Sequence, residues 1–391
     1  MNLNLYFKNN HLNYFFSFVL LILLIFRSSV IKDIIPNYIF YSYIIFLNFY
    51  LFFSDKIIVN KSGLFLYVIC IFSFTFSYIF GWINPILNSS YRLVLFILMF
   101  NIVGPFLNNN TSISFRIILY NSLLISIPFI FLIDCFYILY FRRLTFGGHA
   151  EGFLESPNLS GVIAALNILL FLIYFIRNQK VISKLFYLIY ILFGILILLS
   201  SASRSAILAL LICSLFLLYF NVKKFSIALI FFFFIGFLFF DYVEPFYQIL
   251  ISKIETRNNS GDITAGRANM FQDNFSDFKK NPIFGVGFYN MYNTTNSKIN
   301  DDGSLEYPSG WLFILSTTGL LGLLYFIYIL RYYFFYFFNM SIIKSNILIF
   351  SFLTFFLVHS NFEGYIYSAG GLLFYIFWLC ISSFNDKYMN K

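Results

Sequence analysis

Charged residues are scarce in this chain. Only 10% of its 391 residues are Asp, Glu, Lys or Arg, whereas 60% are hydrophobic, and the mean hydropathy is +0.83. This balance excludes a soluble domain of this size and is typical of an integral membrane protein. Phe (59) and Tyr (30) are abundant throughout, so a single aromatic residue indicates no particular function.

Cysteine is also rare, and no cysteine has the spacing of a zinc or redox site. The four cysteines, Cys70, Cys135, Cys213 and Cys380, fall in apolar runs, and we interpret them as core residues. No acidic cluster is present that would bind a metal, so we predict neither a metal nor another cofactor. The first apolar run lacks a small-residue cleavage site and further runs follow it, so we expect no cleavable signal peptide.

Apolar runs long enough to cross a bilayer recur along the chain. Because roughly 20 apolar residues cover the hydrocarbon core, we expect about twelve transmembrane helices. They cover 13–30, 35–53, 63–82, 91–107, 115–140, 160–177, 184–200, 204–220, 224–241, 309–331, 343–359 and 366–384. The predicted fold is an all-α polytopic membrane protein with one large extracytoplasmic loop between spans 9 and 10.

This reading divides the chain into three parts. Residues 1–241 hold spans 1–9, residues 242–308 form the extracytoplasmic loop, which is partly helical, and residues 309–391 hold spans 10–12. No repeat with a regular period is present.

The formal net charge is +9. In a soluble protein it would suggest a nucleic-acid partner, but here the basic residues lie mostly in short loops, so we expect none. With the N-terminus in the cytoplasm, 13 of the 25 Lys and Arg residues fall in inside segments, 6 in short outside segments and 6 in 242–308. The positive-inside rule therefore predicts that both termini are cytoplasmic.

Four polar stretches do not read as simple connectors. They are 141–159, 200–205, 242–308 and 359–365, which follow spans 5, 7, 9 and 11. In the predicted orientation all four open on the outer face of the membrane. Any chemistry is therefore expected to face outward.

"SSASRS", 200–205, places Ser203 and Arg204 between two apolar runs. An Arg at the centre of a spanning helix costs about 2.5–3.5 kcal/mol. Arg204 instead lies at the outer start of span 8, where it can reach an aqueous cavity while the serines satisfy backbone groups. An interfacial Arg that only snorkels is the alternative. We favour a guanidinium that binds phosphate in bidentate fashion.

"GRANMFQDNFSDFKKNP", 266–282, predicts a helix within the long outer segment. Phe271, Phe275 and Phe278 recur at helical spacing, and Asn281-Pro282 ends the helix. Arg267 lies in its first turn, which is the unfavourable end for a cation. That position favours a role beyond solvation, although a solvated Arg remains the alternative.

"NPIFGVGFYN", 281–290, follows this helix. Gly285 and Gly287 permit either a tight turn or a close approach of the backbone to a ligand. The spacing of two glycines alone is too weak to indicate a nucleotide site.

Two further outer stretches hold candidate polar residues. In "GFLESPNLSG", 152–161, Asn158 and Ser160 are plausible helix caps and Pro157 suits the first turn, so a structural role suffices. "HSNFEGY", 359–365, puts His359, Asn361 and Glu363 at the outer end of span 11. Glu363 is either a buried acid or an ordinary loop carboxylate.

The remaining titratable groups carry weaker signals. His149, Glu151 and Glu155 have no spacing that specifies a metal. Asp134 and Asn101 fall within apolar runs, and we interpret them as packing partners rather than catalysts.

These stretches together carry a family resemblance. "SASRSA" at a helix start, a long outer loop with "GR…NPIFGVGFYN", and "GWLFILSTTGLLGLL" in the next span resemble the O-antigen ligase and Wzy-type polysaccharide polymerase superfamily. "GFLESPNLSG" resembles its upstream motif. The similarity extends over residues 141–330.

The resemblance implies a metal-independent glycosyltransferase that acts at the outer face of the bacterial cytoplasmic membrane. The donor would be an oligosaccharide on undecaprenyl pyrophosphate, with Arg204 and Arg267 as the phosphate-binding residues. Catalysis would then consist of leaving-group stabilisation during attack by an acceptor hydroxyl. Glu363 is the catalytic carboxylate that we favour, and Glu155 and His149 are alternative bases. Further candidate substrate-binding residues are Arg143, Asn158, Ser203, Gly285 and Gly287.

One departure from the family pattern bears on the reaction. Ligases of this family carry a His-Asn pair before the "GLLG" span, and that pair falls on Pro308 and Ser309 here. The missing histidine favours polymerisation of repeat units into O-antigen or capsular polysaccharide over ligation to another acceptor. The expected partners are the lipid-linked oligosaccharide, the bilayer and a chain-length regulator.

A lipid-oligosaccharide flippase or other transporter is the non-enzymatic alternative, because about twelve spans suit it too. A flippase should show polar residues along central helices and internal repeat symmetry. Neither is present, and transport does not require a large outer loop.

Overall fold

The computed structural model describes residues 11–84, 87–141, 152–220, 267–292, 307–337 and 339–389. Over these ranges the regular structure is helical, and β-type pairing is confined to two isolated bridges, Ser29 with Leu154 and Val59 with Leu107. The predicted all-α class is confirmed for these ranges. Several predicted features lie outside them: span 224–241, residues 242–266 and 293–306 of the outer loop, and Arg142, Arg143, His149 and Glu151.

The longer described helices other than α12 overlap predicted spans. In the first part of the chain they are α2 (His11–Arg27), η1 (Lys32–Ile34), α3 (Asn37–Phe53), α4 (Lys61–Ile79), α5 (Ser89–Val103), α6 (Asn110–Phe141), α7 (Pro157–Arg177), α8 (Val181–Ser200) and α9 (Arg204–Phe220). Those that follow are α12 (Arg267–Lys280), α13 (Gly310–Ile329), α14 (Arg331–Tyr336), α15 (Met340–Ser345), α16 (Ile347–His359) and α17 (Leu372–Met389).

Several of these helices are suited to a bilayer. Among the described residues, α4, α6, α7, α8 and α13 are long and apolar enough to cross a membrane. Shorter apolar helices are α2, α3, α5, α9 and α16. The protein is therefore a multi-pass membrane protein by length and composition. The total of about twelve spans remains a prediction from the sequence.

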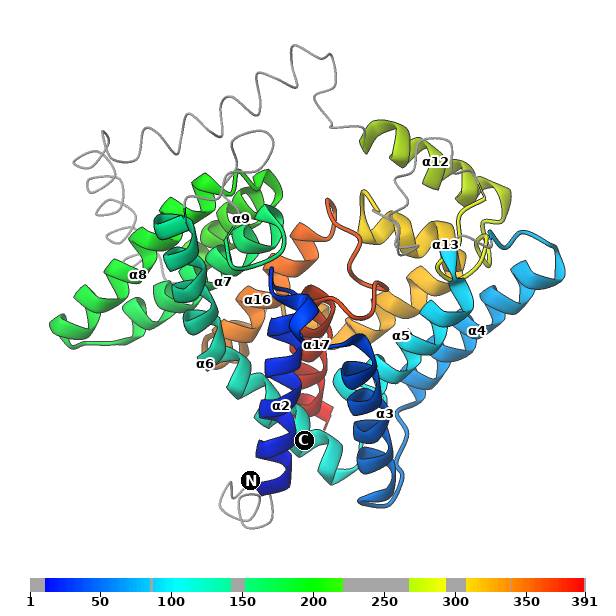
Figure 1. The fold of residues 1–391 in the computed structure, drawn as a ribbon, viewed down its shortest axis with the longest axis horizontal. Helices are drawn as coiled ribbons and strands as arrows, with labels where there is room; N and C mark the ends of the chain where they lie inside the picture. Colours follow the sequence, from blue (N-terminus) through cyan, green and yellow to red (C-terminus); the bar gives the residue numbers. More distant parts are fainter. Residues whose placement is uncertain are drawn as a thin grey trace.

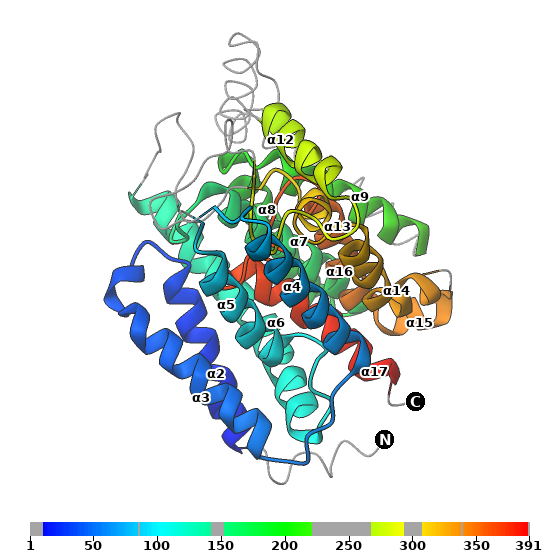
Figure 2. The same cartoon turned by 90° about the vertical axis from the view of Figure 1, so that its right-hand side faces the viewer.

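The first and last described helices, α2 and α17, begin and end on the same side of the molecule. α2 starts and α17 ends at the lower end in Figure 1, whereas α12 lies at the opposite end, over α13 (Figures 1 and 2). We refer to the α12 end as the outer end, following the orientation that the charge distribution predicts.

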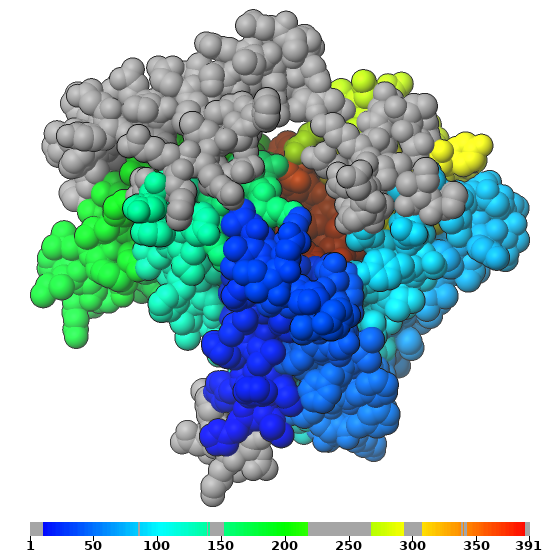
Figure 3. All heavy atoms as spheres, in the orientation of Figure 1, coloured from blue at the N-terminus to red at the C-terminus, as the bar shows by residue number. Residues whose placement is uncertain are grey.

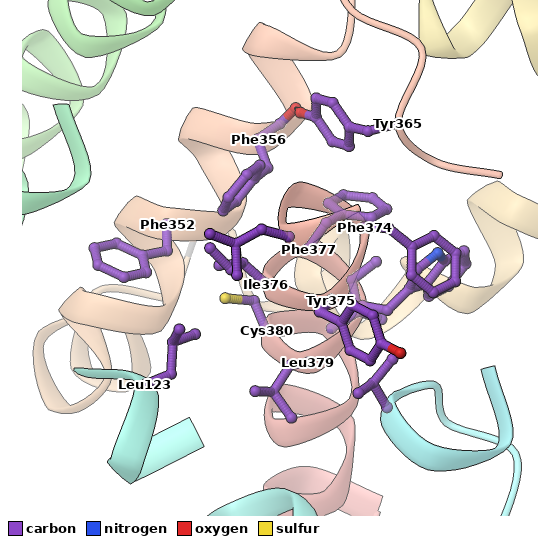
Figure 4. Packing of buried hydrophobic residues seen from close by; sticks show 14 of the residues in the cluster. Leu123, Phe352, Phe356, Tyr365, Phe374, Tyr375, Ile376, Phe377, Leu379 and Cys380 are labelled. Atoms are coloured by element: carbon purple, nitrogen blue, oxygen red, sulfur yellow. The ribbon is translucent and has the colours of Figure 1, made fainter. Parts of the chain in front are cut away.

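The core is built around α7, α16 and α17. In the most apolar stretch of α7, 83% is buried inside the protein. Figure 4 shows Phe356 of α16 and Phe377 of α17 with their rings close together, at 6.1 Å between centroids. Tyr365, from the connection between these helices, donates its hydroxyl to the Phe356 carbonyl at 2.6 Å. The four cysteines are all buried and free, as the sequence predicts for core residues.

A buried ion pair joins the inner ends of two helices. Arg116 of α6 is fully buried and donates from Nε and Nη2 to both carboxylate oxygens of Asp386 in α17, at 2.8 and 2.7 Å. Its Nη1 donates to the Leu107 carbonyl at 2.7 Å. Such a bidentate pair is strong only when both partners are present, because either charge alone would be costly to bury.

Helix α13 is interrupted at Gly319, whose φ of 68° lies in the left-handed region. The interruption frees carbonyl groups that a regular helix would use. The loop after α12 supplies their partners: Val286 N–H donates to the Ser316 carbonyl at 2.8 Å and Gly287 N–H to the Thr317 carbonyl at 3.2 Å. The "NPIFGVG" and "STTG" motifs therefore form one packed unit, since buried backbone groups must find partners.

The predicted helix at 266–282 is confirmed as α12, but its aromatic side faces away from the protein. Phe271 and Phe275 are 36% and 47% exposed. Asp273, Asn274 and Asp277 are instead buried. Asn274 accepts a hydrogen bond from the Ser316 hydroxyl at 2.9 Å. The polar side packs inward because α13 offers polar partners there.

Candidate functional site

The starts of four helices meet the turn that follows α16. This turn, residues 359–363, contacts α7, α9, α12 and α13 near their first residues. Helix N-termini carry unpaired N–H groups and a partial positive charge, so they favour an anion nearby. The sequence placed the same segments on the outer face but could not show that they converge.

Arg267, Asn158 and Glu363 meet at this turn. Arg267 Nη2 donates to Glu363 Oε1 at 2.9 Å, and Asn158 Nδ2 donates to the same oxygen at 3.4 Å. Arg267 Nη1 also donates to the Phe362 carbonyl at 2.7 Å. The side chains of Arg267 and Glu363 are 26% and 20% exposed, so both can still reach a solute. The structure thus brings together three of the predicted site residues.

Arg204 is connected to the same turn through its neighbour. It is the first residue of α9 and is half-buried. The next residue, Ser205, lies with its hydroxyl 3.2 Å from Nε2 of His359. This hydrogen bond fixes the start of α9, and with it Arg204, against the end of α16.

His359 is fully buried. Its ring stacks between Phe355 and Tyr365, with 5.6 Å between centroids on each side. Nδ1 has no hydrogen-bond partner among the described residues. Burial raises the pKa of Tyr365 well above its ordinary value, and the nearby Glu363 charge acts in the same direction. Tyr365 therefore stays protonated and remains a donor to the Phe356 carbonyl.

The serines before Arg204 have the structural role that the sequence suggests. Ser200 and Ser201 donate to the Ile197 and Leu198 carbonyls, each at 2.9 Å, at the end of α8. Ser203 is buried, and its hydroxyl has no hydrogen-bond partner within the described ranges.

The serine turn also packs tightly on the start of α7. A Cβ at Gly161 would lie 2.6 Å from the Ser203 Cβ, so glycine is required there. Ala202 has a φ of 49°, in the left-handed region. Arg204 and Asn158 are therefore held by two segments in direct contact.

The first turn of α7 differs in detail from the prediction. Pro157 is its first residue as expected, but the cap is Ser156, whose hydroxyl accepts from Leu159 N–H at 3.2 Å. Asn158 is directed to Glu363 instead. Ser160 donates to Asp134 at 3.2 Å, so Asp134 is a packing partner, as predicted.

Gly285 and Gly287 approach the protein's own chain closely. Their φ angles are 71° and 117°, which non-glycine residues rarely adopt. A Cβ at Gly285 would lie 2.4 Å from the Thr317 backbone, and one at Gly287 2.3 Å from the Ser77 hydroxyl. Of the two readings that the sequence left open, the tight turn therefore explains these glycines, which position α12 and α13.

Of the two other predicted bases, Glu155 is not part of this cluster. Glu155 forms an ion pair with Lys32, and its side chain is 49% exposed. His149 lies outside the described residues, as does Arg143.

The N-terminus of α13 completes the site. Ser309 caps this helix by accepting from Leu312 N–H at 3.4 Å, and Gly310 N–H donates to the Ser360 carbonyl at 2.7 Å. Pro308 and Ser309 therefore lie directly beside the turn after His359. In the part of the chain that the structure describes, no group of three His, Cys, Asp or Glu residues is arranged to hold a metal.

A family model described as O-antigen ligase matches residues 189–327. The resemblance to the O-antigen ligase and Wzy-type superfamily is confirmed. The matched part includes Arg204, Arg267 and the unit formed by the 282–287 loop with α13, whereas Asn158 and Glu363 lie outside it. No curated protein matches the chain.

The match of this stretch to the O-antigen ligase family model supports a glycosyltransferase-like membrane enzyme of the O-antigen pathway. The family also implies a lipid-linked oligosaccharide as the substrate. It does not distinguish a ligase from a polymerase.

Proposed function

We propose that this protein polymerises undecaprenyl-pyrophosphate-linked repeat units into O-antigen or capsular polysaccharide at the outer face of the cytoplasmic membrane. The observation that carries the proposal is the attachment of Arg204 and Arg267 to one turn. Each is the first residue of a helix, and each is linked to residues 359–363, through Ser205 in one case and directly in the other.

This arrangement suits a pyrophosphate leaving group. A guanidinium binds phosphate oxygens in a bidentate manner, and helix N-termini add N–H groups and positive potential. The bonds from Arg267 to Phe362 and Glu363 use one N–H on each terminal nitrogen, so further N–H groups can reach an anion. The Ser203 hydroxyl, adjacent in sequence to Arg204, is a further donor for the phosphate.

The reaction is a substitution at the anomeric carbon of the donor sugar. An acceptor hydroxyl attacks this carbon while the bond between the carbon and the pyrophosphate oxygen breaks. The electron pair leaves with undecaprenyl pyrophosphate, whose growing charge Arg204 and Arg267 stabilise. The hydroxyl proton passes to the Glu363 carboxylate. Asn158 holds this carboxylate through its 3.4 Å hydrogen bond, and Arg143 remains a candidate substrate contact.

Polymerase is preferred over ligase because of the start of α13. Pro308 has no proton-accepting side chain, and the Ser309 hydroxyl is engaged as the helix cap. Neither takes the role of the histidine that the family's ligases carry. A ligase that uses Glu363 as its base is the second candidate, which the family match equally supports.

Deletion of the gene separates these functions. Loss of a polymerase leaves single repeat units, on undecaprenyl pyrophosphate or on their final acceptor, whereas loss of a ligase leaves long polymer on undecaprenyl pyrophosphate. Gel ladders of the surface glycan and mass spectrometry of lipid-linked intermediates report both. Long chains on the carrier would overturn the polymerase proposal in favour of the ligase, and units trapped on the inner leaflet would indicate a flippase. Loss of a chain-length regulator would change only the most common length of the polymer.

A further inference from the structure

A second group of arginine and tyrosine residues lies at the ends of α2, α3 and α5. Arg27, the last residue of α2, donates from Nη1 to Asn37 Oδ1 at 3.1 Å and from Nη2 to the Tyr41 hydroxyl at 2.7 Å. Its guanidinium carbon is 4.5 Å from the Phe40 ring centroid. Both hydrogen-bond partners are neutral, and no carboxylate among the described residues forms an ion pair with Arg27.

Arg92 continues this group on α5. Its guanidinium carbon is 5.8 Å from the Tyr91 ring and 5.3 Å from the Tyr289 ring. Tyr91 in turn meets Tyr41 edge to face, with 5.9 Å between centroids. Tyrosine rings therefore connect the two arginines, and we call Arg27, Arg92, Tyr41, Tyr91 and Tyr289 the arginine–tyrosine cluster.

The segment that precedes α7 connects this cluster to the site around Glu363. Val30 N–H donates to the Phe153 carbonyl at 2.9 Å, and Glu155 N–H donates to the Ser28 carbonyl at 3.0 Å. The paired segment continues directly to Asn158, which contacts Glu363. The end of α2 is thus attached to the segment that carries Asn158.

A second connection runs through α13. Tyr289 packs its ring on Phe313 of α13, at 5.6 Å between centroids. In Figure 3 the molecule is hollowed beside the upper ends of α2 and α3 (blue), with the orange-red chain that follows α16 at the bottom. The cluster and the proposed reaction site therefore lie at the same end of the molecule.

The chemistry of the cluster suits a phosphate group. Arginine stacked on aromatic rings is weakly hydrated, and its planar N–H edge matches the oxygens of a phosphate or carboxylate group. The positive-inside rule disfavours arginine at outer helix ends. Partly exposed tyrosine rings beside it, such as Tyr91 at 44% exposure, can in addition pack against a sugar or a lipid.

We propose that the arginine–tyrosine cluster is a second phosphate site, which binds the pyrophosphate of the acceptor while Arg204 and Arg267 bind that of the donor. The inference rests on the proposed function, because a polymerase joins two substrates that are both linked to undecaprenyl pyrophosphate, whereas a ligase uses one. Both substrates are anchored in the same leaflet, so each needs a phosphate site at the same end of the protein. The ligand is a membrane-anchored pyrophosphate, and a phospholipid headgroup is the competing source of the same chemistry.

Binding stoichiometry tests the proposal. The full chain in phosphatidylcholine nanodiscs is titrated with undecaprenyl pyrophosphate, and bound lipid is counted by native mass spectrometry. Wild-type protein should bind two molecules, and the Arg27→Gln/Arg92→Gln variant should bind one. Arg331→Gln is the matched control, because Arg331 also stacks on two tyrosines, at 4.1 and 4.5 Å, but at the far end of α13. It should bind two.

The outcomes distinguish this inference from the proposed function. Two molecules bound by Arg27→Gln/Arg92→Gln would overturn the second site. A different result would separate the two claims: Arg204→Gln/Arg267→Gln binds two molecules while Arg27→Gln/Arg92→Gln binds one. It would support the cluster as a phosphate site but contradict the proposed donor site. Displacement of one bound undecaprenyl pyrophosphate by phosphatidylglycerol at equal concentration would identify the cluster as a phospholipid headgroup site. It would overturn the assignment of the cluster to the acceptor.

A conservative variant guards against misfolding. Arg27→Lys/Arg92→Lys keeps both charges but not the planar fork, so the second binding event should weaken by at least about tenfold while the first is unchanged. Unchanged affinity for both molecules would contradict the bidentate mode that we propose.

Discussion

Glu363 Oε1 accepts hydrogen bonds from both Arg267 and Asn158, at 2.9 and 3.4 Å. The three residues come from distant parts of the chain, with Asn158 separated from Glu363 by 205 positions. Each of them lies in the first turn of a helix or shortly after the end of one, so the backbone fixes their relative positions. The same carboxylate therefore holds Arg267, the proposed phosphate-binding residue, and lies beside the proposed position of the leaving group.

Substitution of either proposed phosphate-binding arginine should abolish the proposed polymer formation. Arg204→Ala and Arg267→Ala remove stabilisation of the leaving group, which is worth roughly 10²–10³ in rate for a single oxyanion contact. Arg204→Lys should also be poor, because lysine lacks the planar fork. Gel ladders of the surface glycan measure activity, and immunoblots of membranes should show normal protein levels. Full-length polymer from both alanine variants would contradict the phosphate-binding role.

Glu363→Gln separates the base role from the structural role. The amide keeps one oxygen for Arg267 and Asn158 but cannot take a proton, so the rate should fall by roughly 10²–10⁴ while thermal stability changes little. Asn158→Ala, which removes only the longer hydrogen bond, is the comparison and should lose less. An active Glu363→Gln protein would exclude Glu363 as the general base and leave it as an anchor for Arg267.

His359 should act by positioning Arg204. His359→Gln retains a polar group that can meet Ser205, whereas His359→Phe keeps an aromatic ring between Phe355 and Tyr365 but has no hydrogen bond. The Phe variant should bind undecaprenyl pyrophosphate more weakly at the Arg204 and Arg267 site, and the Gln variant should regain part of the affinity. Equal binding by both variants would show that the hydrogen bond to Ser205 does not position Arg204.

The helix boundaries were largely predictable because a membrane span is a long apolar run that ends at polar residues. The span at 343–359 was wrong in one respect: it is divided at Asn346 into α15 and α16. The side chain of Asn346 donates to the Ile342 carbonyl at 3.0 Å, so a local polar contact replaces the regular helix. Length and hydropathy do not report such a contact.

The inward face of α12 was not predictable from its own residues. Its phenylalanine spacing describes one apolar side, but the direction of that side depends on α13. Gly319 interrupts α13, and the hydrogen bond between Ser316 and Asn274 then draws the polar side of α12 inward. The contact between His359 and Ser205 was missed for the same reason, since 154 positions separate them. A polar residue at the end of each apolar run was the only signal.

The buried pair between α6 and α17 should behave as a stability element rather than a functional one. Arg116→Met leaves the Asp386 charge buried without its main partner, which should cost about 3–5 kcal/mol. Arg116→Met combined with Asp386→Leu removes both charges and should recover much of that loss. Thermal unfolding of the detergent-solubilised protein measures both. A double variant less stable than Arg116→Met would contradict this reasoning.

The orientation can be tested by cysteine labelling of intact cells. Single cysteines at Lys180, in the connection between α7 and α8, and at Asn300, in the predicted outer segment, are exposed to a membrane-impermeant maleimide. The charge distribution predicts labelling at position 300 and none at position 180. The reverse pattern would contradict a reaction at the outer face.

Reconstitution with a single lipid-linked repeat unit tests the central claim most directly. Purified protein in liposomes is given undecaprenyl-pyrophosphate-linked repeat units and no other acceptor, and the products are separated on gels and weighed by mass spectrometry. The proposed polymerase should produce a ladder of oligomers on undecaprenyl pyrophosphate and release free undecaprenyl pyrophosphate, and Arg204→Ala/Arg267→Ala should produce neither. Unchanged repeat units with wild-type protein, which become joined only when a different acceptor is added, would contradict the account and identify a ligase.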